Sequence, residues 1–108
     1  MKQCIVIYNP TSGKQRNEAW FQKFQQILLK YDYQSEIIRT EYAGHAKEII
    51  ASLPHTDLVL SVGGDGTLNE VMSGNLIRSE PLLLAHLPYG TANDIGKMYG
   101  LENICFKI

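Results

Sequence analysis

The chain has 108 residues, of which 44% are hydrophobic and 19% are charged, and its formal net charge is −1. This length and composition fit one globular domain with a single modest core and exclude a disordered chain. The chain has no basic run, so it lacks the electrostatic footprint of a DNA- or RNA-binding protein, and no nucleic-acid partner is expected. Its apolar runs are too short to cross a bilayer and no signal-peptide pattern opens it, which favours a cytoplasmic location.

The first half of the chain alternates between apolar runs and amphipathic stretches. Residues 4–8 (CIVIY) predict a buried strand, and residues 17–31 carry apolar side chains at helical spacing. Residues 35–40 (SEIIRT) predict a second strand, and residues 44–53 predict a short helix that Pro54 ends.

The second half continues this alternation. Residues 58–62 (LVLSV) predict a third strand, and an amphipathic helix is expected to begin near Thr67. The apolar side of this helix is expected to hold Leu68, Val71, Met72 and Leu76. Residues 82–87 (LLLAHL) predict a fourth buried strand, and residues 104–108 (ICFKI) are again strand-like. Because strands alternate with helices and lack period-2 patterning, the sequence predicts a Rossmann-like three-layer α/β domain with a mostly parallel sheet.

Polar loops follow three of the predicted strands, at Asn9–Gly13, Gly63–Thr67 and Gly90–Asp94. In an open parallel sheet, ligands bind beyond the carboxyl ends of the strands. Glycine lets main-chain N–H groups approach a ligand closely, and the amino end of the helix near Thr67 adds unpaired N–H groups suited to phosphate. Thr67 and Glu70 also have the spacing of a capping box, which gives Glu70 a structural role in fixing the start of the helix.

Asp65 lies among glycines in the second of these loops. A carboxylate repels bare phosphate, so an acid beside a phosphate site implies a divalent cation between them, or a hydroxyl to orient. The alternative is a turn carboxylate that accepts hydrogen bonds from nearby main-chain N–H groups. The physical argument alone leaves both interpretations open.

Three segments, NPTSGK at 9–14, GGDGTLNEV at 63–71 and PYGTANDIGK at 88–97, resemble the diacylglycerol kinase catalytic-domain family. This family comprises bacterial soluble lipid kinases, with sphingosine kinases as relatives. The motifs match in order and spacing over essentially the whole chain. The GGDGT element alone is shared with NAD kinases and, as a close variant, with phosphofructokinases, and the other two motifs separate these cases. The resemblance implies a fold of the phosphofructokinase and NAD kinase type.

The resemblance further implies an ATP-dependent kinase that uses Mg²⁺ to phosphorylate the hydroxyl of a lipid such as diacylglycerol. By motif position, the nucleotide would contact Asn9, Pro10, Thr11, Ser12, Gly13, Thr40, Gly64, Asp65, Gly66, Thr67, Leu68, Asn69, Glu70 and Thr91. The resemblance assigns catalytic roles to Asp65 and Asp94, with Asp65 organising the metal ion through water. It thereby favours the functional interpretation of Asp65 over the turn carboxylate.

Family members are considerably longer and carry a second, β-rich domain with the catalytic base, further magnesium ligands and the lipid pocket. Residues 1–108 resemble the amino-terminal nucleotide-binding domain only, so the chain is expected to be truncated and inactive alone. The missing domain would bring the protein to its lipid at the membrane surface, and uncovered apolar surface near residues 104–108 could produce a homodimer. The alternatives are an NAD kinase-like small-molecule kinase, which NPTSGK argues against, and a non-catalytic nucleotide-binding module.

A few single residues carry plainer interpretations. Cys4 lies in an apolar run, which predicts a buried and inert thiol. His86 lies inside a predicted buried strand, where a hydrogen-bonded core histidine is the expected role. Lys14 follows the first loop, where a phosphate contact and a solvated side chain are both open. The scattered histidines argue against a zinc site.

Overall fold

The computed structural model describes residues 1–10, 18–88 and 105–107. Its elements, in chain order, are β1 (Lys2–Tyr8), α1 (Glu18–Lys30), β2 (Tyr33–Arg39), α2 (His45–Ser52), β3 (Leu58–Gly63), α3 (Asp65–Leu76), β4 (Leu84–Pro88) and β5 (Cys105–Lys107). The four strands and three helices expected up to residue 88 are confirmed, with ends that shift by one or two residues. Asn17, where the first helix was expected to begin, lies outside the described residues.

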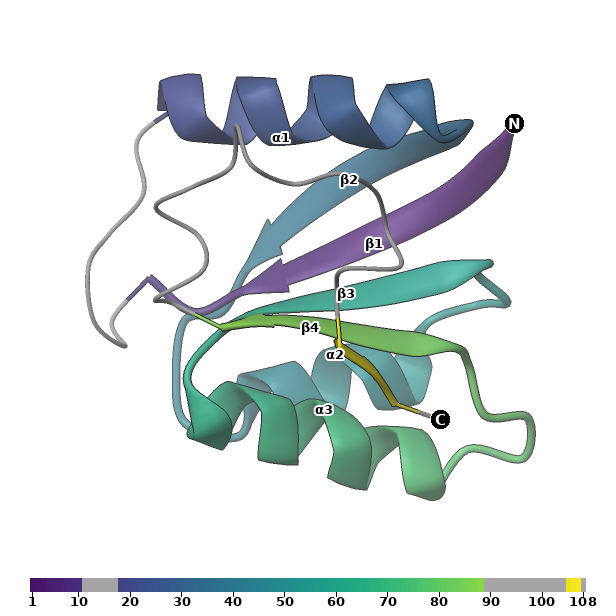
Figure 1. Ribbon diagram of the computed structural model, residues 1–108. Helices are drawn as coiled ribbons and strands as arrows, with labels where there is room; N and C mark the ends of the chain where they lie inside the picture. Colours follow the sequence, from purple (N-terminus) through teal and green to yellow (C-terminus); the bar gives the residue numbers. More distant parts are fainter. Residues whose placement is uncertain (11–17, 89–104, 108) are drawn as a thin grey trace.

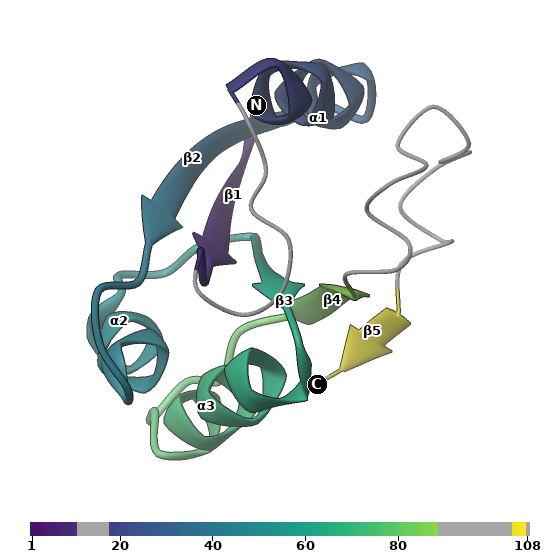
Figure 2. The same cartoon turned by 90° about the vertical axis from the view of Figure 1, so that its left-hand side faces the viewer.

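The strands form one sheet in the order β2-β1-β3-β4-β5. β1 pairs in parallel with β2 and β3, β3 pairs in parallel with β4, and β5 runs antiparallel to β4. Tyr8 is in register with Arg39 on one side and with Val62 on the other, so the parallel strands end at a common edge. Figure 2 looks onto this edge, toward which β1, β2, β3 and β4 run.

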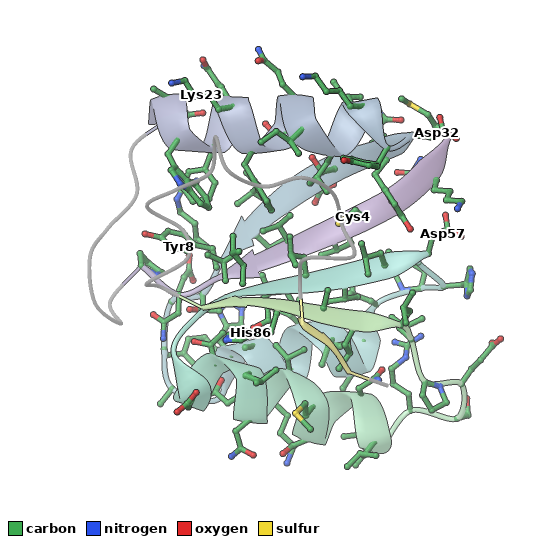
Figure 3. All side chains as sticks on the ribbon, in the orientation of Figure 1. Cys4, Tyr8, Lys23, Asp32, Asp57 and His86 are labelled. Atoms are coloured by element: carbon green, nitrogen blue, oxygen red, sulfur yellow. The ribbon has the colours of Figure 1, made fainter. Side chains whose placement is uncertain are left out.

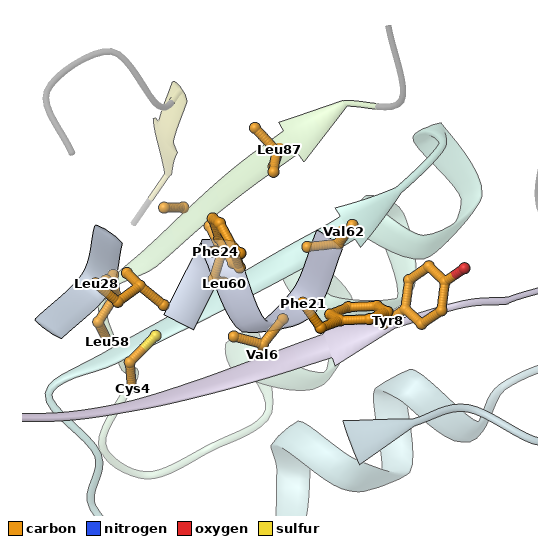
Figure 4. Packing of buried hydrophobic residues seen from close by; sticks show 11 residues of the cluster. Cys4, Val6, Tyr8, Phe21, Phe24, Leu28, Leu58, Leu60, Val62 and Leu87 are labelled. Atoms are coloured by element: carbon orange, nitrogen blue, oxygen red, sulfur yellow. The ribbon is translucent and has the colours of Figure 1, made fainter. Parts of the chain in front are cut away.

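Helices cover both faces of the sheet, α1 on one side and α2 with α3 on the other (Figure 1). The cluster under α1 consists of Cys4, Val6, Tyr8, Phe21, Phe24, Leu28, Leu58, Leu60, Val62, Ala85 and Leu87 (Figure 4). The cluster under α2 and α3 consists of Ile7, Ala46, Ile50, Val59, Val71, Leu82 and Leu84. With helices on both faces of a mostly parallel sheet, the predicted three-layer α/β domain is confirmed.

Among the described residues, no helix is both long and apolar enough to span a bilayer.

α3 begins at Asp65, two residues earlier than expected. Gly63 adopts φ 153°, which favours glycine, and Gly64 is the extended residue from which the helix starts. The carbonyl of Gly64 accepts the N–H of Leu68 as the first helical hydrogen bond. Thr67 is consequently the third residue of the helix and cannot be its N-cap. The predicted capping box between Thr67 and Glu70 is therefore wrong, because two glycines turn the chain into the helix earlier.

The buried side of α3 also differs from the predicted one. The buried residues of α3 are Thr67, Val71, Gly74 and Asn75, whereas Leu76 is 75% exposed. A Cβ on Gly74 would lie 2.5 Å from the Ile50 Cγ2 atom, so this glycine lets α3 pack closely against α2. The close approach turns the small and polar side of α3 inward and leaves Leu76 in solvent.

A buried asparagine fixes the connection from α3 to β4. The Asn75 amide donates to the Leu82 carbonyl over 3.0 Å, and its oxygen accepts the Leu82 N–H over 2.8 Å. Both backbone groups of Leu82 are thus satisfied by one side chain that is only 2% exposed. This pair sets where the chain re-enters the sheet as β4.

Candidate functional site

A cavity of about 200 Å³ opens at the carboxyl edge of the sheet. It lies between the end of β1, the loop from β2 to α2, and the first turns of α2 and α3. Its lining residues are Asn9, Thr40, Glu41, Tyr42, Ala43, Ala46, Thr67 and Glu70. This is the edge at which open parallel sheets hold ligands.

Backbone hydrogen bonds to neighbouring strands hold the two cavity residues that follow β1 and β2. The Thr40 N–H donates to the Tyr8 carbonyl over 2.9 Å, and the Asn9 N–H donates to the Val62 carbonyl over 3.3 Å. Asn9 is therefore tied to β3 while Thr40 is tied to β1. Thr40 is only 8% exposed, and its hydrogen bond to β1 fixes its position at the cavity.

The amino end of α3 presents main-chain donors without side chains over them. The first N–H groups of a helix have no intrahelical acceptor, and together they carry partial positive charge. No side chain of the described residues caps this helix, and a Cβ built on Gly64 or Gly66 would meet no described atom within 4 Å beyond its own turn of the chain. The open space over the first turn is of the kind that a phosphate group occupies at helix amino ends.

Thr67 carries the most informative polar atom of the site. Its side chain is 3% exposed, and its Oγ1 has no hydrogen-bond partner among the described residues. A buried hydroxyl without a partner costs about 1–3 kcal/mol, and such groups are rare in native structures. Thr67 also lines the cavity, at the start of α3.

Asp65 is the first residue of α3, and its side chain is exposed. In the part of the chain that the structure describes, its carboxylate accepts no hydrogen bond. The same part of the chain holds no group of three or more His, Cys, Asp or Glu side chains that could hold a metal ion. Mg²⁺ is usually held by one or two carboxylates together with phosphates and water, so the single Asp65 carboxylate is compatible with that ion only together with such further ligands.

The structure thus brings together part of the predicted set. Asn9, Thr40, Thr67 and Glu70 line the cavity. Gly64, Asp65, Gly66, Leu68 and Asn69 lie at the start of α3 without lining the cavity, and Pro10 follows Asn9. Thr11, Ser12, Gly13, Lys14, Thr91 and Asp94 lie outside the described residues.

The prediction missed the cavity wall formed by Glu41, Tyr42, Ala43 and Ala46. These residues follow β2, whose carboxyl end lies beside that of β1 in the parallel sheet. The position of the loop was therefore implied by the predicted topology. Its sequence lacks the glycine-rich pattern that marked the other loops, so only Thr40 was singled out.

Two buried residues of the sheet serve the core, as expected. His86 is 5% exposed, on the side of the sheet that faces α2 and α3, and its Nδ1 is hydrogen-bonded to Ser61 Oγ over 2.7 Å (Figure 3). Cys4 is a free, buried cysteine, and burial raises the pKa of its thiol to about 12. The predicted core histidine and buried thiol are confirmed.

Comparison with known proteins gives one consistent result. The family model described as "Diacylglycerol kinase catalytic domain" matches residues 3–107. The chain is 36% identical over 106 residues to a diacylglycerol kinase of Bacillus subtilis (strain 168), covering 94% of this chain and 34% of that protein. It is 35% identical over 104 residues to a diacylglycerol kinase of Staphylococcus aureus (strain bovine RF122 / ET3-1), covering 94% of this chain and 33% of that protein.

A solved structure agrees with these sequence matches. The crystal structure of a diacylglycerol kinase from Bacillus anthracis str. Sterne superposes with a TM-score of 0.67 at 25% identity, covering 81% of this chain and 32% of that one. The chain therefore spans about a third of the length of the relatives it matches. Since the family model covers nearly all of its residues, the chain belongs to the diacylglycerol kinase catalytic domain family.

Proposed function

We propose that this chain is the ATP-binding domain of an ATP-dependent lipid kinase, which transfers the γ-phosphate to a lipid hydroxyl such as that of diacylglycerol. The observation that carries the proposal is the buried Thr67 hydroxyl, which lines the cavity at the start of α3 and has no partner among the described residues. The family membership supports the kinase class and implies ATP as the phosphate donor.

In this proposal the first turn of α3 holds the phosphate groups. The N–H groups around Gly64–Thr67 and the Thr67 hydroxyl donate hydrogen bonds to phosphate oxygens. Gly64 and Gly66 leave the space that those oxygens need, since no described atom beyond their own turn of the chain lies within 4 Å of where their Cβ atoms would be. The loop Asn9–Gly13 and Thr91 complete the phosphate contacts, and Thr40 lies farther along the same cavity.

Asp65 is proposed to organise Mg²⁺ through water, and Asp94 is proposed as the second acidic residue of the catalytic centre. When bound, the metal ion neutralises negative charge on the phosphate groups. The Asp65 carboxylate is exposed at the amino end of α3, next to the proposed phosphate position. It can accept hydrogen bonds from water molecules there without losing any that it makes within the described protein.

The acceptor lipid is proposed to bind outside this chain. The matched relatives are about three times as long as the region they share with it. We assign lipid recognition and the catalytic base to the part of such a protein that residues 1–108 do not cover. A lipid acceptor implies that the complete enzyme works at a membrane surface, from the cytoplasmic side.

Calorimetric titration of the chain with ATP, with and without Mg²⁺, tests this proposal. The wild-type chain is expected to bind ATP weakly, and more tightly with Mg²⁺, while Asp65→Asn loses that enhancement. Asp32→Asn is the matched control, because Asp32 lies at the opposite edge of the sheet and its φ of 67° suits asparagine. Tighter binding of NAD than of ATP, or an Mg²⁺ effect that survives in Asp65→Asn, would contradict the proposal.

A second assay addresses phosphate transfer itself. Incubated with radiolabelled ATP, Mg²⁺ and diacylglycerol micelles, the chain alone is expected to phosphorylate no lipid. Transfer requires the acceptor hydroxyl to lie in line with the phosphate and near a base, and the proposal assigns both to the uncovered part of the enzyme. Lipid phosphorylation by this chain that disappears in Asp65→Asn would show that residues 1–108 suffice, contrary to this assignment.

A further inference from the structure

Two aromatic rings lie stacked where the loop after β2 meets the start of α2. The rings of Tyr42 and His45 are 4.3 Å apart between centroids and nearly parallel, at 12°. Tyr42 lines the cavity, yet 55% of its side chain remains exposed. An aromatic ring that is both oriented and half uncovered has an apolar surface available to a ligand.

Hydrogen bonds fix this pair in place. The Glu41 N–H donates to His45 Nδ1 over 2.9 Å, and the His45 N–H donates to the Tyr42 carbonyl over 3.1 Å. Gly44, at φ 88°, supplies the left-handed turn between the rings. The neighbouring Glu48 carboxylate raises the pKa of the Tyr42 phenol. A ring held in advance loses little conformational freedom when a ligand stacks on it.

The cavity gives this ring a defined relation to the phosphate position. Thr67 lines it from the start of α3, and Tyr42 lines it from the loop after β2. The lining also includes Ala43 and Ala46, whose small side chains leave room for a flat group. A ligand with phosphates at α3 would therefore extend its remaining part toward Tyr42.

We propose that Tyr42 stacks on the base of the bound nucleotide and is a determinant of nucleotide affinity in this chain. The inference rests on the proposed function, because it takes the phosphates to lie at α3. His45 acts as a positioning residue, since it supports the Tyr42 ring from one face. Tyr42 contributes through its aromatic ring.

The test compares ATP with inorganic tripolyphosphate, which carries the phosphates but no base, each titrated with Mg²⁺. Tyr42→Ala is expected to weaken ATP binding roughly fivefold to a hundredfold, the range for loss of aromatic stacking on a base. It should leave tripolyphosphate binding unchanged. Tyr42→Phe keeps the ring and should retain ATP affinity within about threefold.

Thr67→Val reports separately on the phosphate site, and should weaken both ligands. Unchanged ATP affinity in a folded Tyr42→Ala chain would overturn the stacking role. Equal weakening of ATP and tripolyphosphate in Tyr42→Ala would also overturn it, because Tyr42 would then only brace the loop. Binding of neither ligand by the wild-type chain would refute the proposed function, and the role of Tyr42 with it.

Discussion

Gly74 of α3 lies against Ile50 of α2 so closely that a Cβ on the glycine would come within 2.5 Å of Ile50 Cγ2. The same Cβ would lie 2.5 Å from the backbone carbonyl oxygen of Lys47. A side-chain methyl can move aside, but a helical carbonyl cannot do so cheaply. This contact fixes the spacing of the two helices whose first turns form part of the cavity wall.

Gly74→Ala is therefore expected to lower the free energy of unfolding by about 1–3 kcal/mol, the usual cost of overpacking a core. The higher helix propensity of alanine offsets at most about 1 kcal/mol of this. Urea denaturation followed by circular dichroism measures the difference. A variant as stable as the wild-type chain would show that α2 and α3 are not held this closely.

Gly66→Ala is expected to behave in the opposite way. An added Cβ would meet no described atom within 4 Å beyond its own turn of the chain, and the backbone φ is not positive, so stability should stay level or rise by up to about 1 kcal/mol. ATP affinity should fall about tenfold, or about 1.4 kcal/mol, because the methyl group occupies the space proposed for phosphate. Normal ATP binding by this variant would argue against a phosphate site over the first turn of α3.

Asn75→Ala is expected to destabilise the domain by about 2–3 kcal/mol, because it leaves the N–H and the carbonyl of Leu82 buried without their partner. Thermal unfolding is the measurement. Asn69→Ala is the matched control on the same helix, since Asn69 is exposed and its loss should change stability by less than about 0.5 kcal/mol. Equal effects of the two changes would contradict a structural role for Asn75.

Cys4 gives a prediction on pH. Its thiol has a pKa of about 12 in the folded chain against 9.0 for an unburied thiol, because burial disfavours the thiolate. A group whose pKa is raised by folding contributes stability below its unfolded pKa and loses it as the pH rises through the folded value. The free energy of unfolding should therefore decline between pH 9 and about 12, and Cys4→Ala should flatten that decline. An identical pH profile in Cys4→Ala would show that the thiol ionises freely in the folded chain.

Much of the fold was predictable because each buried strand can be recognised from its own residues. A strand covered on both faces must be apolar on both, so CIVIY and LVLSV could be assigned without knowledge of the partners. Helices such as Glu18–Lys30 bury one stripe, which periodicity detects. The position of the candidate site at the carboxyl edge of the sheet followed from the parallel pairing of the strands alone.

Contacts between distant segments were not predictable in the same way. The buried side of α3 depends on how closely Gly74 approaches α2, and its first residue depends on the backbone at Gly63 and Gly64. Neither the buried side nor the first residue of α3 can be read from the spacing of apolar residues within the helix. Tyr42 was missed because its importance arises from the stack with His45 and from the cavity beside it.

Thr67→Val tests the central claim, that the start of α3 is a phosphate site, most directly. Valine keeps the branched shape and removes only the hydroxyl, which has no partner among the described residues. The melting temperature should stay level or rise, because an unsatisfied buried hydroxyl costs about 1–3 kcal/mol, while ATP affinity should fall about tenfold. Thr67→Ser, which keeps the hydroxyl, should bind ATP as the wild-type chain does. If Thr67→Val melts at a lower temperature and binds ATP with unchanged affinity, the hydroxyl serves the fold and the claim is contradicted.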